Sequence, residues 1–137
     1  MVGKFSKRLA HDEGGFTLIE LLVVLVIIGI LLAIAVPSYL GFKDRANKRA
    51  AESDIREAIP SMEAYYSDNG TYVGATPAAL KAIDSGLSGA VVTGGLTATA
   101  YCIGAAVGSQ SWSVLGPGAS AWYSAATNCS GASTTTP

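Results

Sequence analysis

The carboxylates, the lysines, the arginines and the one histidine all lie in the first 84 residues of this 137-residue chain. Between Ser85 and Pro137 there is no aspartate, glutamate, lysine, arginine or histidine. The serines of this region therefore lack a base that could activate them as nucleophiles. The only histidine is His11, so we expect neither a metal site nor a cofactor. The sequence predicts that the protein is not an enzyme.

The charge balance does not favour nucleic acid as a partner. The formal net charge is −1, and only 14% of the residues are charged, compared with about 25% in an average soluble domain. A DNA-binding surface needs a basic patch. The candidates are Lys43, Arg45, Lys48 and Arg49, and we expect these side chains to face solvent or neighbouring copies of the chain. No nucleic-acid binding is predicted.

One carboxylate stands apart from the other charges. Glu20 directly precedes a stretch without charge from Leu21 to Phe42, and no polar side chain interrupts Leu21–Val36. As a helix, residues 16–36 would be roughly 30 Å long, which matches the hydrocarbon core of a bilayer. A carboxylate beside such a core costs roughly 2–3 kcal/mol on insertion scales. Glu20 is therefore a candidate functional residue.

Two simpler interpretations of the apolar stretch remain open at this point. The first is a secretory signal peptide that is cut after Ala35, and the second is a plain single-pass anchor. Neither explains Glu20. Cleavage after Ala35 would also leave Val36 and Pro37 as the start of a helix that visibly continues.

Basic residues near the N-terminus predict the orientation in the membrane. Lys4, Lys7 and Arg8 precede the apolar stretch, and positive residues tend to remain on the cytoplasmic side. We therefore expect the C-terminal region outside the cytoplasm. The basic residues that follow Phe42 weaken this orientation signal.

The helix is expected to continue beyond the membrane, from about residue 16 to residue 67. Apolar residues recur at three- or four-residue intervals, with one slip between Ala50 and Ile55. This stripe is Phe42, Ala46, Ala50, Ile55, Ile59, Met62 and Tyr66. Two acid-before-base pairs at i,i+4 spacing are expected on its exposed face, Asp44 with Lys48 and Glu52 with Arg56.

Two prolines lie inside this predicted helix. Pro37 and Pro60 each lack an N–H donor and crowd the carbonyl four residues earlier. Neither neighbourhood has the composition of a loop, so we expect kinks rather than helix ends. Gly29 weakens the apolar half further. Gly70 suits the left-handed position just after the helix.

The C-terminal region predicts a small antiparallel sheet. Thr76 followed by Pro77 is typical of a helix start, so a short helix is expected at about 77–85. Strands are expected at 97–107, 111–115 and 121–123, with a weak edge strand near 90–93. We expect the apolar face of the sheet to pack on the second half of the long helix, which gives an α+β fold. That face should include Tyr101, Ile103, Trp112 and Val114.

Cys102 and Cys129 are the only cysteines. Both lie on the predicted exported side, where oxidation favours a disulfide. A bridge would close a loop of ~27 residues and contribute roughly 3–4 kcal/mol on the chain-entropy model. Two free thiols are the alternative. Residues 130–137, rich in serine and threonine, have the composition of a flexible tail.

The sequence around Glu20 resembles the N-terminus of type IV prepilins and their relatives. Gly14-Gly15 followed by Phe16-Thr17-Leu18-Ile19-Glu20 and then an apolar run matches the family pattern of leader, cleavage site and fifth-position glutamate. Pro37 lies where pilins carry a kinking proline. The segment Tyr65–Tyr72 also resembles the end of the pilin helix. The close likeness covers roughly residues 8–72.

The resemblance implies a processing pathway and a domain plan. A prepilin peptidase would remove residues 1–15 as a cytoplasmic leader by cutting after Gly15, and would methylate the amino group of Phe16. Residues 16–41 would form the membrane-spanning and filament-core helix. Residues 42–137 would form the extracytoplasmic globular domain, with its sheet at about 90–125. Between Gly29 and Pro37 the helix can partly melt on assembly in this family.

Glu20 receives a role from the same resemblance. A negative charge is favourable near a helix N-terminus, and the carboxylate could pair with the α-amino group of Phe16 or with that of a neighbouring subunit. An unpaired carboxylate in hydrocarbon is costly, so such pairing would select one axial register during assembly.

The implied function is that of a structural subunit of a type IV pilus, serving adhesion, twitching motility or biofilm formation. The expected partners are the prepilin peptidase, the inner-membrane pilus assembly machinery, membrane lipid and further copies of the chain. The expected location is the cytoplasmic membrane before assembly and an extracellular filament afterwards. A minor pilin, and a pseudopilin of type II secretion or competence, are alternatives. A monomeric membrane-anchored binding module is an alternative of another class.

One feature separates the pilin from the pseudopilin alternative. The usual major pseudopilin binds calcium through acidic oxygen ligands in a C-terminal loop. No carboxylate follows Asp84 in this chain. This distribution, together with the expected disulfide, favours a pilin.

Overall fold

The computed structural model describes residues 15–130 and 133–134. The chain divides into two units, of which the first runs to Tyr39 and the second begins at Leu40. Residues 1–14 of the predicted leader 1–15 lie outside the described residues, as do five residues of the predicted tail.

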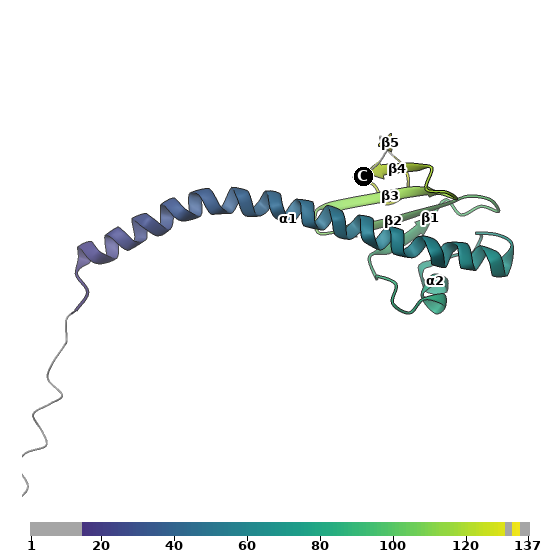
Figure 1. The fold of residues 1–137 in the computed structure, drawn as a ribbon, viewed down its shortest axis with the longest axis horizontal. Coiled ribbons are helices and arrows are strands. Elements are labelled where there is room, and N and C mark those ends of the chain that lie inside the picture. Colours follow the sequence, from purple (N-terminus) through teal and green to yellow (C-terminus); the bar gives the residue numbers. More distant parts are fainter. Residues whose placement is uncertain (1–14, 131–132, 135–137) are drawn as a thin grey trace, which may run out of the picture. The chain divides into compact units, whose positions relative to one another are not determined.

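The first unit contains the apolar part of helix α1, which runs from Leu18 to Asn69 (Figure 1). By length and composition, α1 is apolar and long enough to cross a membrane. The apolar side chains of this part of α1 are exposed within the unit, since none of its most apolar 18-residue segment is buried. Helix α1 continues through Pro37 and Pro60, so neither proline ends it. Kinks at these prolines remain a prediction.

The second unit packs the later part of α1 against an antiparallel sheet (Figure 1). The buried apolar positions of the helix are Ala51, Ile55, Ala58 and Met62, which follow one another at intervals of four, three and four residues. The predicted stripe was therefore wrong at Phe42, Ala46, Ala50 and Tyr66, which are exposed. Because alanine is acceptable both inside and outside, Ala50 and Ala51 compete for the same apolar face, and the sheet selects Ala51.

Helix α1 ends as its sequence predicts. Gly70 follows Asn69 with a φ of 68°, and its N–H donates to the carbonyl of Tyr66 at 2.7 Å. This left-handed cap satisfies one carbonyl of the last turn. Helix α2, Pro77–Ile83, begins after Thr76, whose hydroxyl accepts a hydrogen bond from the Ala79 N–H at 3.3 Å.

The sheet has five strands in the order β1-β2-β3-β4-β5, and every neighbouring pair is antiparallel. Residues 133–134, predicted to belong to the tail, form its last short strand. The strands are β1 Val91–Gly94, β2 Tyr101–Val107, β3 Gln110–Gly116, β4 Ala121–Ser124 and β5 Ser133–Thr134.

The register of the central strands places the predicted core residues on one face. Ile103 pairs with Val114, and Ala105 pairs with Trp112. These residues and Tyr101 are buried together with Ile55 and Met62 of α1. The α+β class and the four predicted core residues of the sheet are confirmed.

Candidate processing and assembly site

The predicted cleavage point lies in the segment that precedes α1. Gly15, Phe16 and Thr17 are non-helical and exposed, and 89% of the Phe16 side chain is accessible. A protease requires an extended, accessible substrate. Both residues that flank the predicted cleavage point are therefore accessible in the described part of the chain.

A capping box holds the start of α1. The Glu20 backbone N–H donates to the Thr17 hydroxyl oxygen at 3.3 Å. In return the Glu20 carboxylate accepts from the Thr17 N–H at 3.3 Å and from its hydroxyl at 3.1 Å. Two backbone donors at the helix start are thereby satisfied, and the negative charge lies at the positive end of the helix dipole.

Thr17 was not identified as a functional residue from the sequence, although the sequence contains the pattern that predicts its role. A threonine followed three residues later by glutamate, just before an apolar run, is the sequence pattern of a capping box. The structure gives Glu20 a partner within its own chain, and this partner lies one residue beyond the Phe16 amine considered above.

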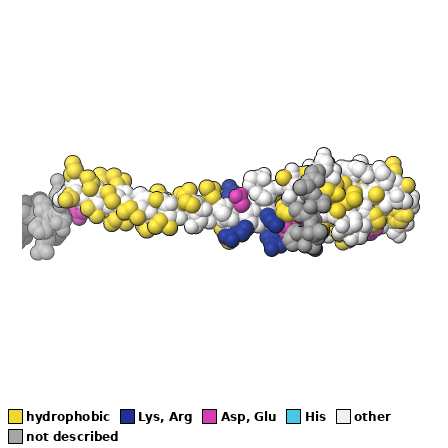
Figure 2. All heavy atoms as spheres, turned by 90° about the horizontal axis from the view of Figure 1, so that it is seen from above, with side chains coloured by type: hydrophobic (Ala, Val, Ile, Leu, Met, Phe, Trp, Pro, Cys, Tyr) yellow, Lys and Arg dark blue, Asp and Glu magenta, His cyan; other side chains and the backbone are white. Residues whose placement is uncertain are grey.

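The apolar part of α1 presents an exposed hydrophobic surface on every side. From Leu18 to Tyr39, Glu20 is the only charged residue. Soluble proteins rarely expose a continuous apolar surface of this extent, so lipid or other protein must cover it. Gly29 and Pro37 lie inside this segment and are exposed, whereas Pro60 is an exposed position in the second unit. Figure 2 shows hydrophobic side chains spread along this helix.

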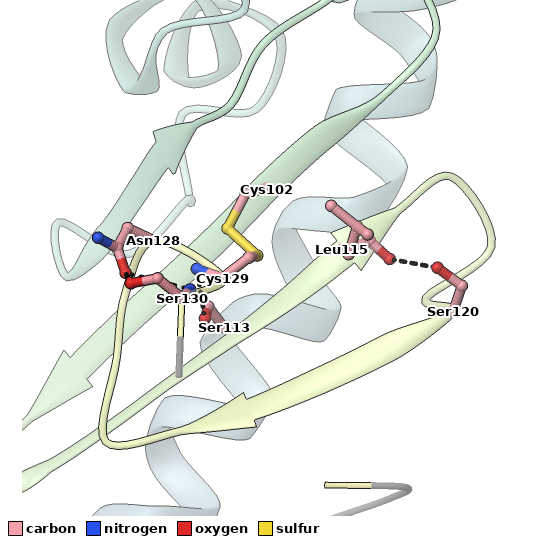
Figure 3. Close-up of a disulfide and its surroundings, with 7 residues drawn as sticks. All are labelled: Cys102, Ser113, Leu115, Ser120, Asn128, Cys129 and Ser130. Atoms are coloured by element: carbon pink, nitrogen blue, oxygen red, sulfur yellow. Dashed lines mark hydrogen bonds between the residues drawn. A yellow bond between two sulfur atoms is a disulfide. The ribbon is translucent and has the colours of Figure 1, made fainter. Parts of the chain in front are cut away.

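The disulfide between Cys102 and Cys129 is present and ties the chain after β4 to β2 (Figure 3). The Cys129 N–H donates to the hydroxyl of Ser113 at 3.0 Å, and Ser113 is fully buried. Gly104, next but one to Cys102, lies beneath the backbone of Thr127, where a Cβ would overlap the carbonyl. The segment before Cys129 thus covers the sheet face opposite α1.

A shared carboxylate joins α1 to the sheet. Glu63 accepts hydrogen bonds from the hydroxyls of Tyr72 and Tyr101, both at 2.9 Å. The Tyr72 ring also stacks on Tyr66 and meets the edge of Tyr101. Burial, and then the hydrogen bond to Glu63, raise the pKa of Tyr72 to about 12. The same two causes raise the pKa of Tyr101.

A second carboxylate is buried on the sheet-facing side of α1. Glu52 lies 3.6 Å from the Lys48 ammonium and 3.2 Å from the Arg49 guanidinium. These partners differ from the predicted pairs, because Asp44 instead accepts a hydrogen bond from Ser109 at 3.0 Å. Two cations offset the cost of removing one carboxylate from water.

Comparisons with known proteins bear on these features. Residues 11–36 match the model of the prokaryotic N-terminal methylation motif. The type II secretion system core protein G of Escherichia coli (strain K12) is 42% identical over 65 residues, which are 47% of this chain and 45% of that protein. The type IV wide pilus major component PilA4 of Thermus thermophilus is 33% identical over 97 residues, which are 68% of this chain and 72% of that protein.

The chain belongs to the type IV pilin-like family. Its relatives include both pilus components and secretion-system core proteins. A further pilin, the type IV major pilin protein PilA of Myxococcus xanthus, is 38% identical over 71 residues, which are 52% of this chain and 30% of that protein. The matches to the secretion core proteins cover less than half of those proteins' length.

The matched motif contains some features of this pilin-like chain and leaves others outside it. The capping box lies inside the matched methylation motif, together with Phe16 and Glu20. The disulfide and the uncharged sheet lie outside that motif. The motif therefore covers the start of the helix, whereas the 97 residues matched to PilA4 extend well beyond it.

Proposed function

We propose that this protein is the structural subunit of a type IV pilus, made as a membrane-anchored prepilin. In this proposal a prepilin peptidase cuts after Gly15 and methylates the new amino group of Phe16. The mature subunit then leaves the membrane and polymerises through the apolar part of α1. Lipid covers that surface before assembly, and neighbouring copies cover it afterwards.

One observation carries the proposal. An accessible Gly15–Phe16 bond stands directly before a capped helix whose first half exposes apolar side chains and a single charge, Glu20. A signal peptide would place its cleavage site beyond the apolar stretch, and a plain anchor would require no carboxylate at its start. Cleavage before the stretch retains it for assembly.

Glu20 is proposed to control the register of assembly. In the isolated chain its carboxylate is held by Thr17, so the helix can enter lipid with that charge partly satisfied. After cleavage, the α-amino group of Phe16 becomes available next to it. Pairing between a carboxylate and an amine of neighbouring subunits would favour one axial position, since other positions leave charges unpaired in an apolar core.

The test is the chemical state of the mature N-terminus. Mass spectrometry of filaments sheared from cells should identify this protein as the main component, with N-methyl-Phe16 as its first residue. The change Gly15→Val, which adds a branched side chain at the cleavage site, should leave the precursor uncut. An intact Met1, or a terminus at Val36, would refute the proposal.

A pseudopilin of a type II secretion system is the second candidate, and the 42% identity to core protein G supports it. That identity is confined to 47% of this chain. The C-terminal region offers no acidic ligand after Asp84 and carries a disulfide instead, which supports the pilus.

Deletion of the gene separates the two candidates. Loss of surface filaments with normal protein secretion is expected for the pilus subunit. Loss of secretion with filaments intact would assign the chain to a pseudopilus. Loss of filaments that is restored by trace expression would indicate a minor pilin. A monomer in membranes with no filament form would instead indicate a binding module.

A further inference from the structure

The helix carries a group of cations immediately after its apolar stretch. Four basic residues lie within seven positions, Lys43, Arg45, Lys48 and Arg49. Figure 2 shows Lys and Arg side chains gathered over one segment of the helix. Placing positive residues on the exported side opposes the usual orientation signal. These cations are therefore candidates for binding an anion on that side.

Contacts within the helix and with the sheet neutralise only part of this positive charge. Lys48 pairs with Glu52 and lies over the Trp112 ring at 4.5 Å. Arg49 also contacts Glu52, but 75% of its side chain is exposed. Lys43 and Arg45 are exposed and make no ion pair or hydrogen bond with another described residue. The local carboxylate of Asp44 is directed to Ser109.

Arg45 and Arg49 stand four residues apart, on one face of the helix. Like charges at this spacing repel each other unless an anion lies between them. Phe42 lies on the same side, three residues before Arg45, and is 66% exposed. This face therefore combines an apolar side chain with two guanidinium groups that together lack one counterion.

The depth of these cations in a bilayer follows from the helical rise. The stretch without charge from Leu21 to Phe42 amounts to about 33 Å of helix, close to a ~30 Å hydrocarbon core. Lys43 and Arg45 then lie about 2 and 5 Å beyond its edge, within the headgroup layer. The Arg49 backbone lies about 10 Å beyond, a few Å outside that layer, so its long side chain would have to reach back towards the headgroups.

We propose that Lys43, Arg45 and Arg49 form a binding site for the phosphate groups of anionic phospholipids in the outer leaflet of the membrane. The inference rests on the proposed membrane-anchored precursor. Guanidinium groups bind phosphate through paired hydrogen bonds, and ammonium groups bind it as point charges. The site would hold the subunit at a fixed depth until the assembly machinery withdraws it.

The test uses the full-length mature chain in vesicles of equimolar phosphatidylcholine and phosphatidylglycerol. Electron paramagnetic resonance of spin-labelled lipids measures how strongly the protein prefers one headgroup over the other. We expect a preference for phosphatidylglycerol that falls at high salt. The triple change Lys43→Gln, Arg45→Gln and Arg49→Gln should reduce it at least fivefold, since each cation near an anionic surface contributes about that factor.

Two controls separate charge from structure. The change Lys81→Gln removes a cation from α2, outside the proposed site, and should leave the preference unchanged. The exchange Lys43→Arg, Arg45→Lys and Arg49→Lys keeps the charge and should retain most of the preference for phosphatidylglycerol. Intact tryptophan fluorescence of the triple variant would show that the second unit is folded.

The outcomes distinguish the partner. Equal binding of both lipids by the wild type, or an unchanged preference in the triple variant, would overturn the proposal. If that variant keeps its lipid preference but forms no filaments, the cations bind carboxylates of neighbouring subunits instead. Failure of the pilus proposal would appear separately, as an unmethylated or uncut N-terminus in the wild type.

Discussion

Removing the disulfide should destabilise the second unit by an amount that its loop length sets. Cys102 and Cys129 are 27 residues apart in sequence. On the chain-entropy model, closing such a loop lowers the entropy of the unfolded chain by roughly 12 cal/mol/K, or about 3.5 kcal/mol at 25 °C. The change Cys102→Ala with Cys129→Ala should therefore lower the free energy of unfolding by about this amount.

Urea unfolding of the full chain in detergent micelles measures this effect. Trp112 and Trp122 are 7% and 5% exposed and both belong to the second unit, so their fluorescence reports its unfolding. With a slope of 1–3 kcal/mol/M, typical of small domains, the midpoint should fall by about 2 M.

The matched control is chemical reduction. A reducing agent should shift the wild-type midpoint to that of the double variant, and should not move the variant further. A loss below about 1 kcal/mol would refute the reasoning. It would mean that the Cys129 hydrogen bond to Ser113 and the packing over Gly104 hold the segment without the covalent bond.

Three further predictions concern the capping box, the shared carboxylate and the covered sheet face. Thr17→Val should speed hydrogen exchange in the first turn of α1 about fivefold, because a lost cap costs about 1 kcal/mol. Thr17→Ser keeps the hydroxyl and should preserve the protection. Equal exchange rates in the two variants would contradict the capping role. The pKa of Tyr72 is raised from 10.0 to about 12 in the fold, so its contribution to stability is complete below pH 10 and is lost as pH rises towards 12. Tyr72→Phe should therefore flatten the alkaline fall in the free energy of unfolding, and an unchanged slope would exclude Tyr72 as its source. Gly104→Ala should destabilise the second unit by roughly 1–3 kcal/mol in urea titrations, since its Cβ would overlap the Thr127 backbone, while Gly94→Ala, where the space is open, should cost far less.

The elements were predictable where local chemistry decides them. The cap at Thr76, the proline after it and the glycine after Asn69 each act through their immediate neighbours, and all three lie where expected. The strands around Tyr101 and Trp112 also followed from short apolar segments with turn residues between them. The prediction of 97–107 for the first of them began four residues too early, since β2 starts at Tyr101.

The polar contacts between distant segments could not be predicted in the same way. Glu63 meets Tyr101 across 38 residues of sequence, and Ser113 meets Cys129 across 16. No periodicity encodes such pairs, because they depend on how the helix and sheet are placed in space. The prediction for Glu52 was wrong for a similar reason. An acid in a charged segment was expected on the surface, but Glu52 is buried.

The motif of the candidate site could be predicted from the sequence, but the geometry of its hydrogen bonds could not. Gly15, Phe16 and Glu20 were identified from their order before an apolar run. Thr17 gains its role only from the backbone conformation that places its hydroxyl within reach of Glu20. Hydrogen bonds of a helix start depend on where that helix begins, which sequence patterns locate only approximately.

The uncharged sheet has a consequence for the colloidal behaviour of any filament that displays it. Beyond Asp84 the chain has no charged side chain at neutral pH, so the strands and their connecting loops supply little long-range repulsion between two such surfaces. Their mutual attraction would change little with ionic strength, because there is little for salt to screen. Filaments coated in this way would gather side by side into bundles through short-range contact, and dilution rather than desalting would separate them.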